Sequence, residues 1–127
     1  MRALMAIGLV LALPTSALAA PPLTIAEFVQ RAEPLMKKSM ASLVFSAEAR
    51  KLMKEFGAAA EAVRTRQEAD LAAGRKPATC LPPKGKAKVD ARELIAHLRA
   101  VPAAEQQHSF QSGFAGFVAR KYPCPAR

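Results

Sequence analysis

Apolar residues recur every three or four positions along most of the chain between residues 23 and 122. This spacing places them on one side of successive amphipathic helices. The period-two alternation of a half-buried strand does not occur, and alanine, which favours helices over strands, is abundant throughout. The pattern therefore predicts an all-α fold, a small bundle of about four helices.

The first predicted helix begins with a strong start signal. Thr24 and Glu27 form a capping box, in which each side chain satisfies the backbone N–H of the other residue. Pro34 is expected to kink this helix or to restart it, so that a second segment runs from about Leu35 to Val44. The apolar stripe of the region consists of Ile25, Phe28, Val29, Ala32 and Met36.

A long helix is expected next. Ser46 can cap a helix that begins near Ala47, and Gly74 is a natural stop in the left-handed position after a last helical turn. The stretch 64–70 is strongly polar, so the final turns are expected to project into solvent or to contact a partner. The apolar side of this helix is marked by Leu52, Met53, Phe56, Ala60, Val63 and Leu71.

Two further helices are predicted after a loop over residues 75–88. Asp90 and Glu93 repeat the capping-box signal, and Pro102 ends that helix or opens the next turn. One face of it is formed by Leu94, Ile95, Leu98 and Val101. The last helix ends at Tyr122-Pro123, and its stripe of Phe110, Phe114, Phe117 and Val118 is more typical of a core than of a ligand platform.

The first 19 residues are predicted to be a signal peptide. Arg2 supplies a positive start, residues 3–13 are an unbroken apolar run, Pro14 ends it, and Ala17-Leu18-Ala19 predicts cleavage after Ala19. The alternative is an uncleaved membrane anchor, but the run is about half the ~20 residues that a spanning helix needs. Residues 20–127 are expected to form a single periplasmic or secreted domain without a transmembrane segment.

The chain contains two cysteines, Cys80 and Cys124, and each lies in a proline-marked turn. In an oxidising compartment an even number of cysteines favours disulfides, and two cysteines allow one intramolecular pairing. The alternative is a metal or redox site, but no Cys-x-x-Cys occurs and two ligands are too few for structural zinc. The sequence therefore predicts that residues 80–124 form a two-helix unit closed by one disulfide.

Basic residues outnumber acidic ones, and the formal net charge of the whole chain is +9. The signal peptide contributes one of these charges, so +8 remains after cleavage. In an exported protein this charge favours an acidic protein partner, anionic lipid head groups or cell-wall phosphates, and nucleic acid is not expected. The alternative is that the charges only solvate helix faces. The candidate partner-binding residues are Arg64, Arg66, Arg75, Lys76, Lys84, Lys86 and Lys88.

Catalytic signals in the sequence are weak. The only histidines are His97 and His108, and no His-Glu-x-x-His, Gly-x-Ser-x-Gly or phosphate-binding glycine loop occurs. We therefore expect no enzyme, no catalytic or metal-binding residue and no cofactor. An enzyme would need a cleft that contains one of these histidines with a carboxylate within hydrogen-bond reach.

Two sets of polar or sulfur-containing residues have alternative interpretations. Ser109 and Ser112 lie near the start of the last helix, where helix caps are more typical than nucleophiles. Met36, Met40 and Met53 could suggest a soft-metal site. Their spacing on amphipathic segments favours core filling instead.

From Cys80 to Cys124 the chain resembles the C-terminal half of the Rap1a/Tai family of small exported immunity proteins. The order of the matching elements is a cysteine and proline, a capped helix, a proline, a polar stretch with histidine, an apolar helix and an aromatic-Pro-Cys ending. In this chain they are Cys80, Pro82, Val89-Asp90, Leu94, Leu98, Pro102, His108, Phe114 and Tyr122-Pro123-Cys124. The N-terminal half departs from the pattern, because the long helix from Ala47 replaces the family's early cysteine and Gly-Tyr-like segment.

The resemblance implies a helical periplasmic protein with a disulfide. Family members of known role bind and block peptidoglycan amidase effectors, so it also implies an immunity-type protein whose partner is a toxin. The alternative is a basic protein that associates with the envelope or the cell wall through its charge and has no catalytic activity.

Overall fold

A computed structural model describes residues 21–126, so the predicted signal peptide and the cut after Ala19 lie outside the described residues. Within this range the chain forms five α-helices and one 3-10 helix: α1 (Ile25–Met36), α2 (Met40–Val44), α3 (Ala47–Ala72), α4 (Ala91–Ala100), η1 (Ala103–Glu105) and α5 (Phe110–Lys121). Extended pairing among these residues is limited to one isolated bridge, between Thr24 and Ser109. The predicted all-α bundle is confirmed.

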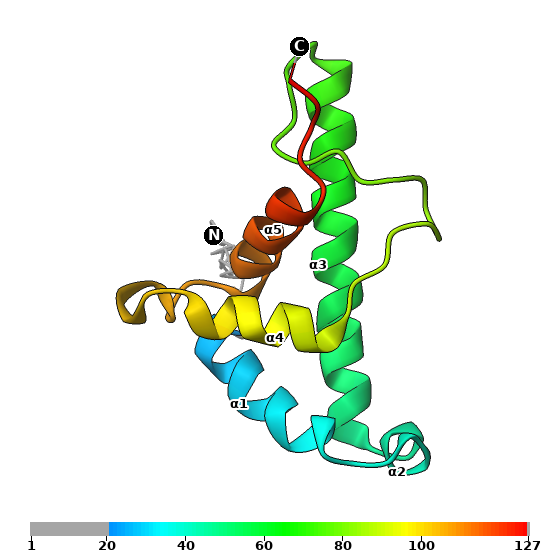
Figure 1. Ribbon diagram of the computed structural model, residues 1–127, viewed down its shortest axis with the longest axis vertical. Coiled ribbons are helices and arrows are strands. Elements are labelled where there is room, and N and C mark those ends of the chain that lie inside the picture. The colour runs from blue at the N-terminus through cyan, green and yellow to red at the C-terminus, as the bar shows by residue number, and fades with distance from the viewer. Residues whose placement is uncertain (1–20, 127) are drawn as a thin grey trace, which may run out of the picture.

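The 26-residue helix α3 is the longest element, and the other helices are arranged beside it (Figure 1). Helix α5 packs along α3, α4 packs on α1 and α5, and α1 also reaches α3. Helix α2 lies at one end of the molecule and packs on α3 (Figure 1). The C-terminal end of α3 projects beyond the bundle in the opposite direction, together with the chain terminus.

The core is centred on the phenylalanine stripe of α5, as the sequence predicts. Phe110 stacks on Phe28 of α1 with ring centroids 3.8 Å apart, and Phe114 meets Phe56 of α3 edge to face at 5.1 Å. Gly113 lies between these phenylalanines on the buried side of α5. In place of a side chain it has a hydrogen atom there, which leaves room for the side chains of Ile25 from α1 and Leu98 from α4. The buried apolar residues are Ile25, Phe28, Ala32, Leu52, Ala59, Val63, Leu94, Ile95, Leu98, Phe110, Phe114, Phe117 and Val118.

The start of α1 is attached to the segment that precedes α5. Thr24 and Glu27 form the predicted capping box. The Ile25 N–H donates to the carbonyl of His108 at 2.9 Å, and the Phe110 N–H donates to the carbonyl of Leu23 at 2.7 Å. Backbone groups that a helix N-terminus leaves unpaired are thus satisfied by the other end of the sequence.

The predicted restart of the helix at about Leu35 is wrong. Helix α1 continues through Pro34 to Met36, because the proline falls in the last turn and removes only the hydrogen bond to the carbonyl of Gln30. The Lys37 N–H then donates to the Pro34 carbonyl at 3.4 Å and closes the end of the helix. The second segment starts at Met40, and residues 37–39 separate it from α1.

The predicted limits of the long helix are confirmed. The Ser46 hydroxyl accepts a hydrogen bond from the Ala49 N–H at 3.2 Å. At the other end Gly74 has φ +71°, and its N–H donates to the carbonyl of Leu71 while the Arg75 N–H donates to that of Asp70. These two bonds are the pattern of a Schellman motif, which satisfies the last carbonyls of the helix.

Four residues expected on the apolar side of the helices are exposed. Met36 is 38% exposed, Met40 78%, Met53 67% and Leu71 56%. Met53 follows the buried Leu52 and therefore lies about 100° around α3 from the core-facing side. Helix α2 has no buried residue, and Leu71 lies where α3 has left the bundle. The interpretation of the three methionines as core filling is wrong.

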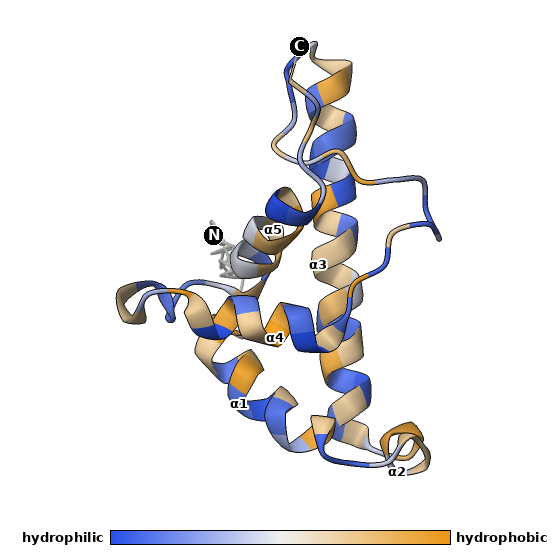
Figure 2. Ribbon diagram, in the orientation of Figure 1, coloured by the Kyte–Doolittle hydropathy of each residue, from blue (hydrophilic) through white to orange (hydrophobic). Residues whose placement is uncertain are grey.

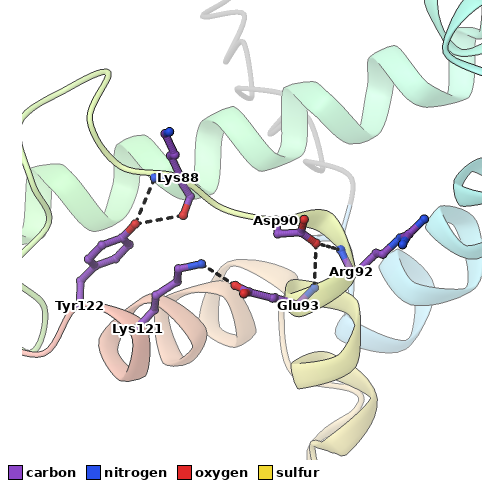
Figure 3. A network of polar contacts seen from close by, with 6 residues as sticks. All are labelled: Lys88, Asp90, Arg92, Glu93, Lys121 and Tyr122. Carbon is purple, nitrogen blue, oxygen red and sulfur yellow. Dashed lines mark hydrogen bonds and ion pairs between the residues drawn. The ribbon is translucent and has the colours of Figure 1, made fainter.

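The capping box predicted for α4 forms in part. The Asp90 carboxylate accepts from the N–H groups of Arg92 and Glu93, at 2.7 and 3.2 Å. The Glu93 side chain points instead to the ammonium of Lys121 on α5 (Figure 3). This hydrogen bond raises the pKa of Lys121 above its ordinary value.

The C-terminus of α4 is capped by a side chain from the loop that follows it. The Gln106 amide donates to the carbonyls of Leu98 and Val101, at 2.9 and 2.8 Å. Leu98 lies in the last turn of α4, where its carbonyl also accepts from the Val101 N–H at 3.3 Å, and Val101 is the C-cap of the helix. The turn between α4 and α5 is thereby fixed to the helix that it leaves.

Candidate functional site

The predicted disulfide between Cys80 and Cys124 is present, with a Cα–Cα distance of 4.8 Å. It joins the loop that follows α3 to the tail that follows α5. Next to it the Cys80 N–H donates to the carbonyl of Tyr122 at 2.9 Å. The Tyr122 hydroxyl reaches Lys88 at the far end of the same loop, where it accepts from the N–H and donates to the carbonyl, both at 3.0 Å (Figure 3).

The same loop is also attached to the side of α3. Both terminal nitrogens of Arg64 donate to the carbonyl of Pro82 at 3.4 Å. One turn further along the helix, the Gln67 side-chain oxygen accepts from the Leu81 N–H at 2.8 Å. Polar residues near the end of α3 thus hold the loop, so the expectation that they project into solvent or contact a partner is only partly met.

We call residues 64–88 with the tail 122–126 the distal arm. It contains all seven residues predicted to bind a partner, and the structure brings Arg64 and the loop together as described above. Arg75 is an ion-pair partner of Asp70, at 2.9 Å. The remaining five are exposed, and within residues 21–126 none of them forms an ion pair: Arg66, Lys76, Lys84, Lys86 and Lys88.

The charge of the distal arm is strongly unbalanced. Between residues 64 and 88 there are seven basic residues and two acidic residues, Glu68 and Asp70. Since Asp70 is engaged by Arg75, the unpaired charge of this surface is almost entirely positive. Figure 2 shows hydrophilic residues along much of this end of α3 and the loop beside it. The arrangement is suited to an anionic or acidic surface.

A second surface, which the sequence analysis missed, lies at the α2 end of the molecule (Figure 2). Phe45 is 83% exposed and Val44 is 65% exposed, and they follow the exposed Met40. Met36 from the end of α1 and Met53 from α3 are exposed as well. We call these five residues the apolar corner. The signal that could have indicated it is the shortness of the helix between the caps Ser39 and Ser46, which cannot bury all of its apolar residues.

The two histidines line one cleft of about 400 Å³ between α4, η1 and α5. The lining also includes Glu105, Ser112 and Arg120. His97 is half-buried, with its ring edge to face on Phe117 at 5.4 Å. Partial burial lowers the pKa of His97 below its ordinary value, and the positive charge of Arg120 lowers it further.

The polar contacts of this cleft are sparse. Within residues 21–126 neither imidazole forms a side-chain hydrogen bond. Ser109 is the N-cap of α5 and accepts from the Ser112 N–H at 3.2 Å, while the Ser112 hydroxyl donates back to the Ser109 carbonyl at 2.8 Å. The serines thus have the local role that the sequence favoured. Residues 21–126 contain no group of three His, Cys, Asp or Glu residues arranged to hold a metal ion.

None of the helices in the described part of the chain combines the length and the apolar character needed to cross a bilayer. The fold and surfaces define a small all-helical protein, closed by one disulfide, with a basic arm at one end and an apolar corner at the other. No family model, no curated protein and no solved structure matches the chain.

Proposed function

We propose that this chain is an exported binding protein without catalytic activity, and that its distal arm recognises an acidic surface on a protein partner. The observation that carries the proposal is the fixed basic loop. The loop that the disulfide, Tyr122, Arg64 and Gln67 hold in place carries four exposed basic side chains without ion-pair partners in residues 21–126: Lys76, Lys84, Lys86 and Lys88.

A loop that is already ordered favours tight binding. Association costs free energy when side chains and loops must be immobilised, and a segment fixed before binding avoids part of that cost. The loop from Cys80 to Lys88 is attached to Tyr122 at both ends and to Arg64 of α3 through the Pro82 carbonyl. Between these points a local turn is closed by the Lys86 N–H, which donates to the Pro83 carbonyl at 2.9 Å. The positive charges of the loop also raise the association rate with an acidic partner, because they attract it before contact.

The resemblance of residues 80–124 to the Rap1a/Tai family narrows the proposed partner. It favours an immunity-type role, in which the partner is a toxin that acts on peptidoglycan and the chain blocks it in the periplasm. The predicted signal peptide supports this location. If the chain is exported as proposed, N-terminal sequencing of the mature protein will find Ala20 as the first residue.

The proposed absence of catalysis concerns the histidine cleft. A general base is normally oriented by a third group through a hydrogen bond. Within residues 21–126 the imidazoles of His97 and His108 have no such partner, although Glu105 lines the same cleft. The protein-binding proposal uses neither histidine, so replacing each by alanine should leave partner capture unchanged.

The experiment is a pull-down from envelope extract with the exported protein as bait. The expected result is a specific partner, identified by mass spectrometry, that is released as the salt concentration rises. The product of the neighbouring gene is the first candidate for its identity. The variant Lys84→Glu with Lys86→Glu should weaken capture at least about tenfold, since like charges then face the partner.

The matched control is Lys37→Glu with Lys38→Glu, which makes the same charge change at the opposite end of the molecule. It should retain the partner. Equal capture by the wild type and the Lys84→Glu, Lys86→Glu variant would overturn the assignment of the binding surface to the distal arm.

A further inference from the structure

Basic residues are close in the sequence to the residues of the apolar corner. Between residues 36 and 54 the chain contains one acidic residue, Glu48, and five basic residues: Lys37, Lys38, Arg50, Lys51 and Lys54. All five basic residues are exposed. The Glu48 carboxylate lies 3.9 Å from the guanidinium of Arg31, so part of its charge is already offset within the chain.

The residues of the apolar corner make little contact with the core of the fold. Helix α2 packs on α3, and none of its residues is buried. Met40 and Val44 are four residues apart on one side of α2, and Phe45 follows directly at its end. On α3 the exposed Met53 is adjacent to Lys54. The end of α1, helix α2 and the first turns of α3 lie at the same end of the molecule (Figure 1), and each has exposed apolar residues with basic residues close to them in the sequence.

We propose that the apolar corner docks on an anionic phospholipid surface. Phe45, Met40 and Val44 enter the boundary between head groups and acyl chains, which accommodates apolar side chains of a peripheral protein. The ammonium groups of Lys37 and Lys38 remain among the phosphates, while their aliphatic stems cover the apolar residues.

Charge complementarity favours a lipid surface over a second copy of the chain. Two corners brought together would place five positive charges against five others, with one acidic residue on each side. An anionic bilayer instead neutralises these charges and receives the apolar residues at the same time. The chain then lies on the surface without spanning it.

Docking at the corner orients the rest of the molecule. Helix α3 connects the two ends and has 26 residues, which corresponds to roughly 39 Å at the usual rise of an α-helix. The distal arm begins at the opposite end of α3, and its loop runs back beside that helix to the start of α4, which keeps it apart from the α2 end that would contact the lipid (Figure 1). Membrane docking and partner binding therefore use separate surfaces, and each can fail without the other.

The test measures binding of the mature protein to vesicles of phosphatidylcholine with and without phosphatidylglycerol. Binding should require the anionic lipid and weaken steeply between about 0.05 and 0.5 M NaCl. The variant Met40→Ser with Phe45→Ser should lose at least about tenfold in affinity, as should Lys37→Glu with Lys38→Glu. The replaced residues are exposed, so the helical circular dichroism and the melting temperature should stay close to those of the wild type.

Matched controls come from the distal arm. Leu71→Ser removes an exposed apolar side chain, and Lys84→Glu with Lys86→Glu reverses two exposed charges there. Both controls should bind the vesicles as the wild type does. Three outcomes would overturn the proposal: no binding to anionic vesicles, equal loss in the control variants, or sedimentation that shows a dimer broken by Phe45→Ser without any vesicle binding.

Discussion

The Tyr122 hydroxyl exchanges two hydrogen bonds with the backbone of Lys88, each 3.0 Å long. The same residue accepts from Cys80 through its carbonyl at 2.9 Å. One tyrosine therefore holds the loop from residue 80 to residue 88 at both ends, next to the disulfide. The sequence marks Tyr122 as the end of the last helix and as part of the aromatic-Pro-Cys ending. Its partner at residue 88 cannot be identified from local patterns.

Replacing Tyr122 by phenylalanine should loosen the far end of this loop. The change removes both bonds to Lys88 and leaves the bond between the Tyr122 carbonyl and Cys80 in place. We expect a loss of about 1 kcal/mol in stability. Hydrogen exchange at the Lys88 amide should become faster, while exchange at the Cys80 amide stays slow. Unchanged exchange at Lys88 would show that the hydroxyl does not hold the loop.

Loss of the disulfide should lower stability more strongly. The cysteines are 44 residues apart, and closing a loop of that length stabilises a fold by up to about 4 kcal/mol on the chain-entropy model. Cys80→Ser combined with Cys124→Ser should therefore melt well below the oxidised wild type. Added dithiothreitol should lower the melting temperature of the wild type and leave the double variant unaffected. Two free thiols in the exported protein would contradict the prediction.

Gly113 is required where α5 approaches α1 and α4. A Cβ at this position would lie 2.9 Å from side-chain atoms of Ile25 and of Leu98, which are both buried. Gly113→Ala should therefore cost roughly 1–3 kcal/mol in urea unfolding, as overpacking does in well-packed cores.

The matched control for this substitution lies three residues further along the same helix. The nearest atom to a Cβ at Gly116 is the Nε2 of His97, 3.9 Å away. Gly116→Ala should be neutral or stabilising by up to about 1 kcal/mol, since alanine restricts the unfolded chain. If both alanine variants were equally stable, the close packing around Gly113 would be disproved.

The stability of the fold should depend on the ionisation of His97. Its pKa in the folded chain is below the ordinary value of 6.5, because partial burial and Arg120 disfavour the imidazolium. The unfolded chain therefore binds more protons in this range, and stability falls as the pH drops below about 6.5.

The measurement compares melting temperatures at about pH 7.5 and about pH 5. His97→Gln removes the titrating ring and should show a smaller decrease than the wild type. His108→Gln, at the exposed histidine of the same cleft, is the control and should behave as the wild type does. An equal decrease in the wild type and in His97→Gln would exclude His97 as the cause.

Local signals predicted the ends of the helices well. The caps at Thr24, Ser46 and Gly74 depend on residues within one turn, and their hydrogen bonds are those expected. Long-range pairing was beyond such signals. Glu93 satisfies the capping-box pattern, yet its carboxylate pairs with Lys121 on another helix.

Of the two surfaces, the sequence located the distal arm and missed the apolar corner, because local signals do not show which elements pack together. Basic composition located the distal arm, but the bond from Arg64 to Pro82 depends on how the loop folds back on α3. The apolar corner was missed because periodicity shows that Met40 and Met53 are apolar, not whether another element covers them. Only the packing of α2 on α3 decides that question.

The attachment of α1 to the segment before α5 affects the order of folding. The N–H groups of Ile25 and Ala26 in the first turn of α1 donate to the carbonyls of His108 and Gln106. The first residues of the fold therefore complete their hydrogen bonds only when residues 106–108 are present. A chain released from its amino end can form separate helices early, but it cannot complete its bundle until nearly its whole length is free. The chain would therefore remain incompletely folded until most of it has crossed the membrane. This agrees with the export that we propose.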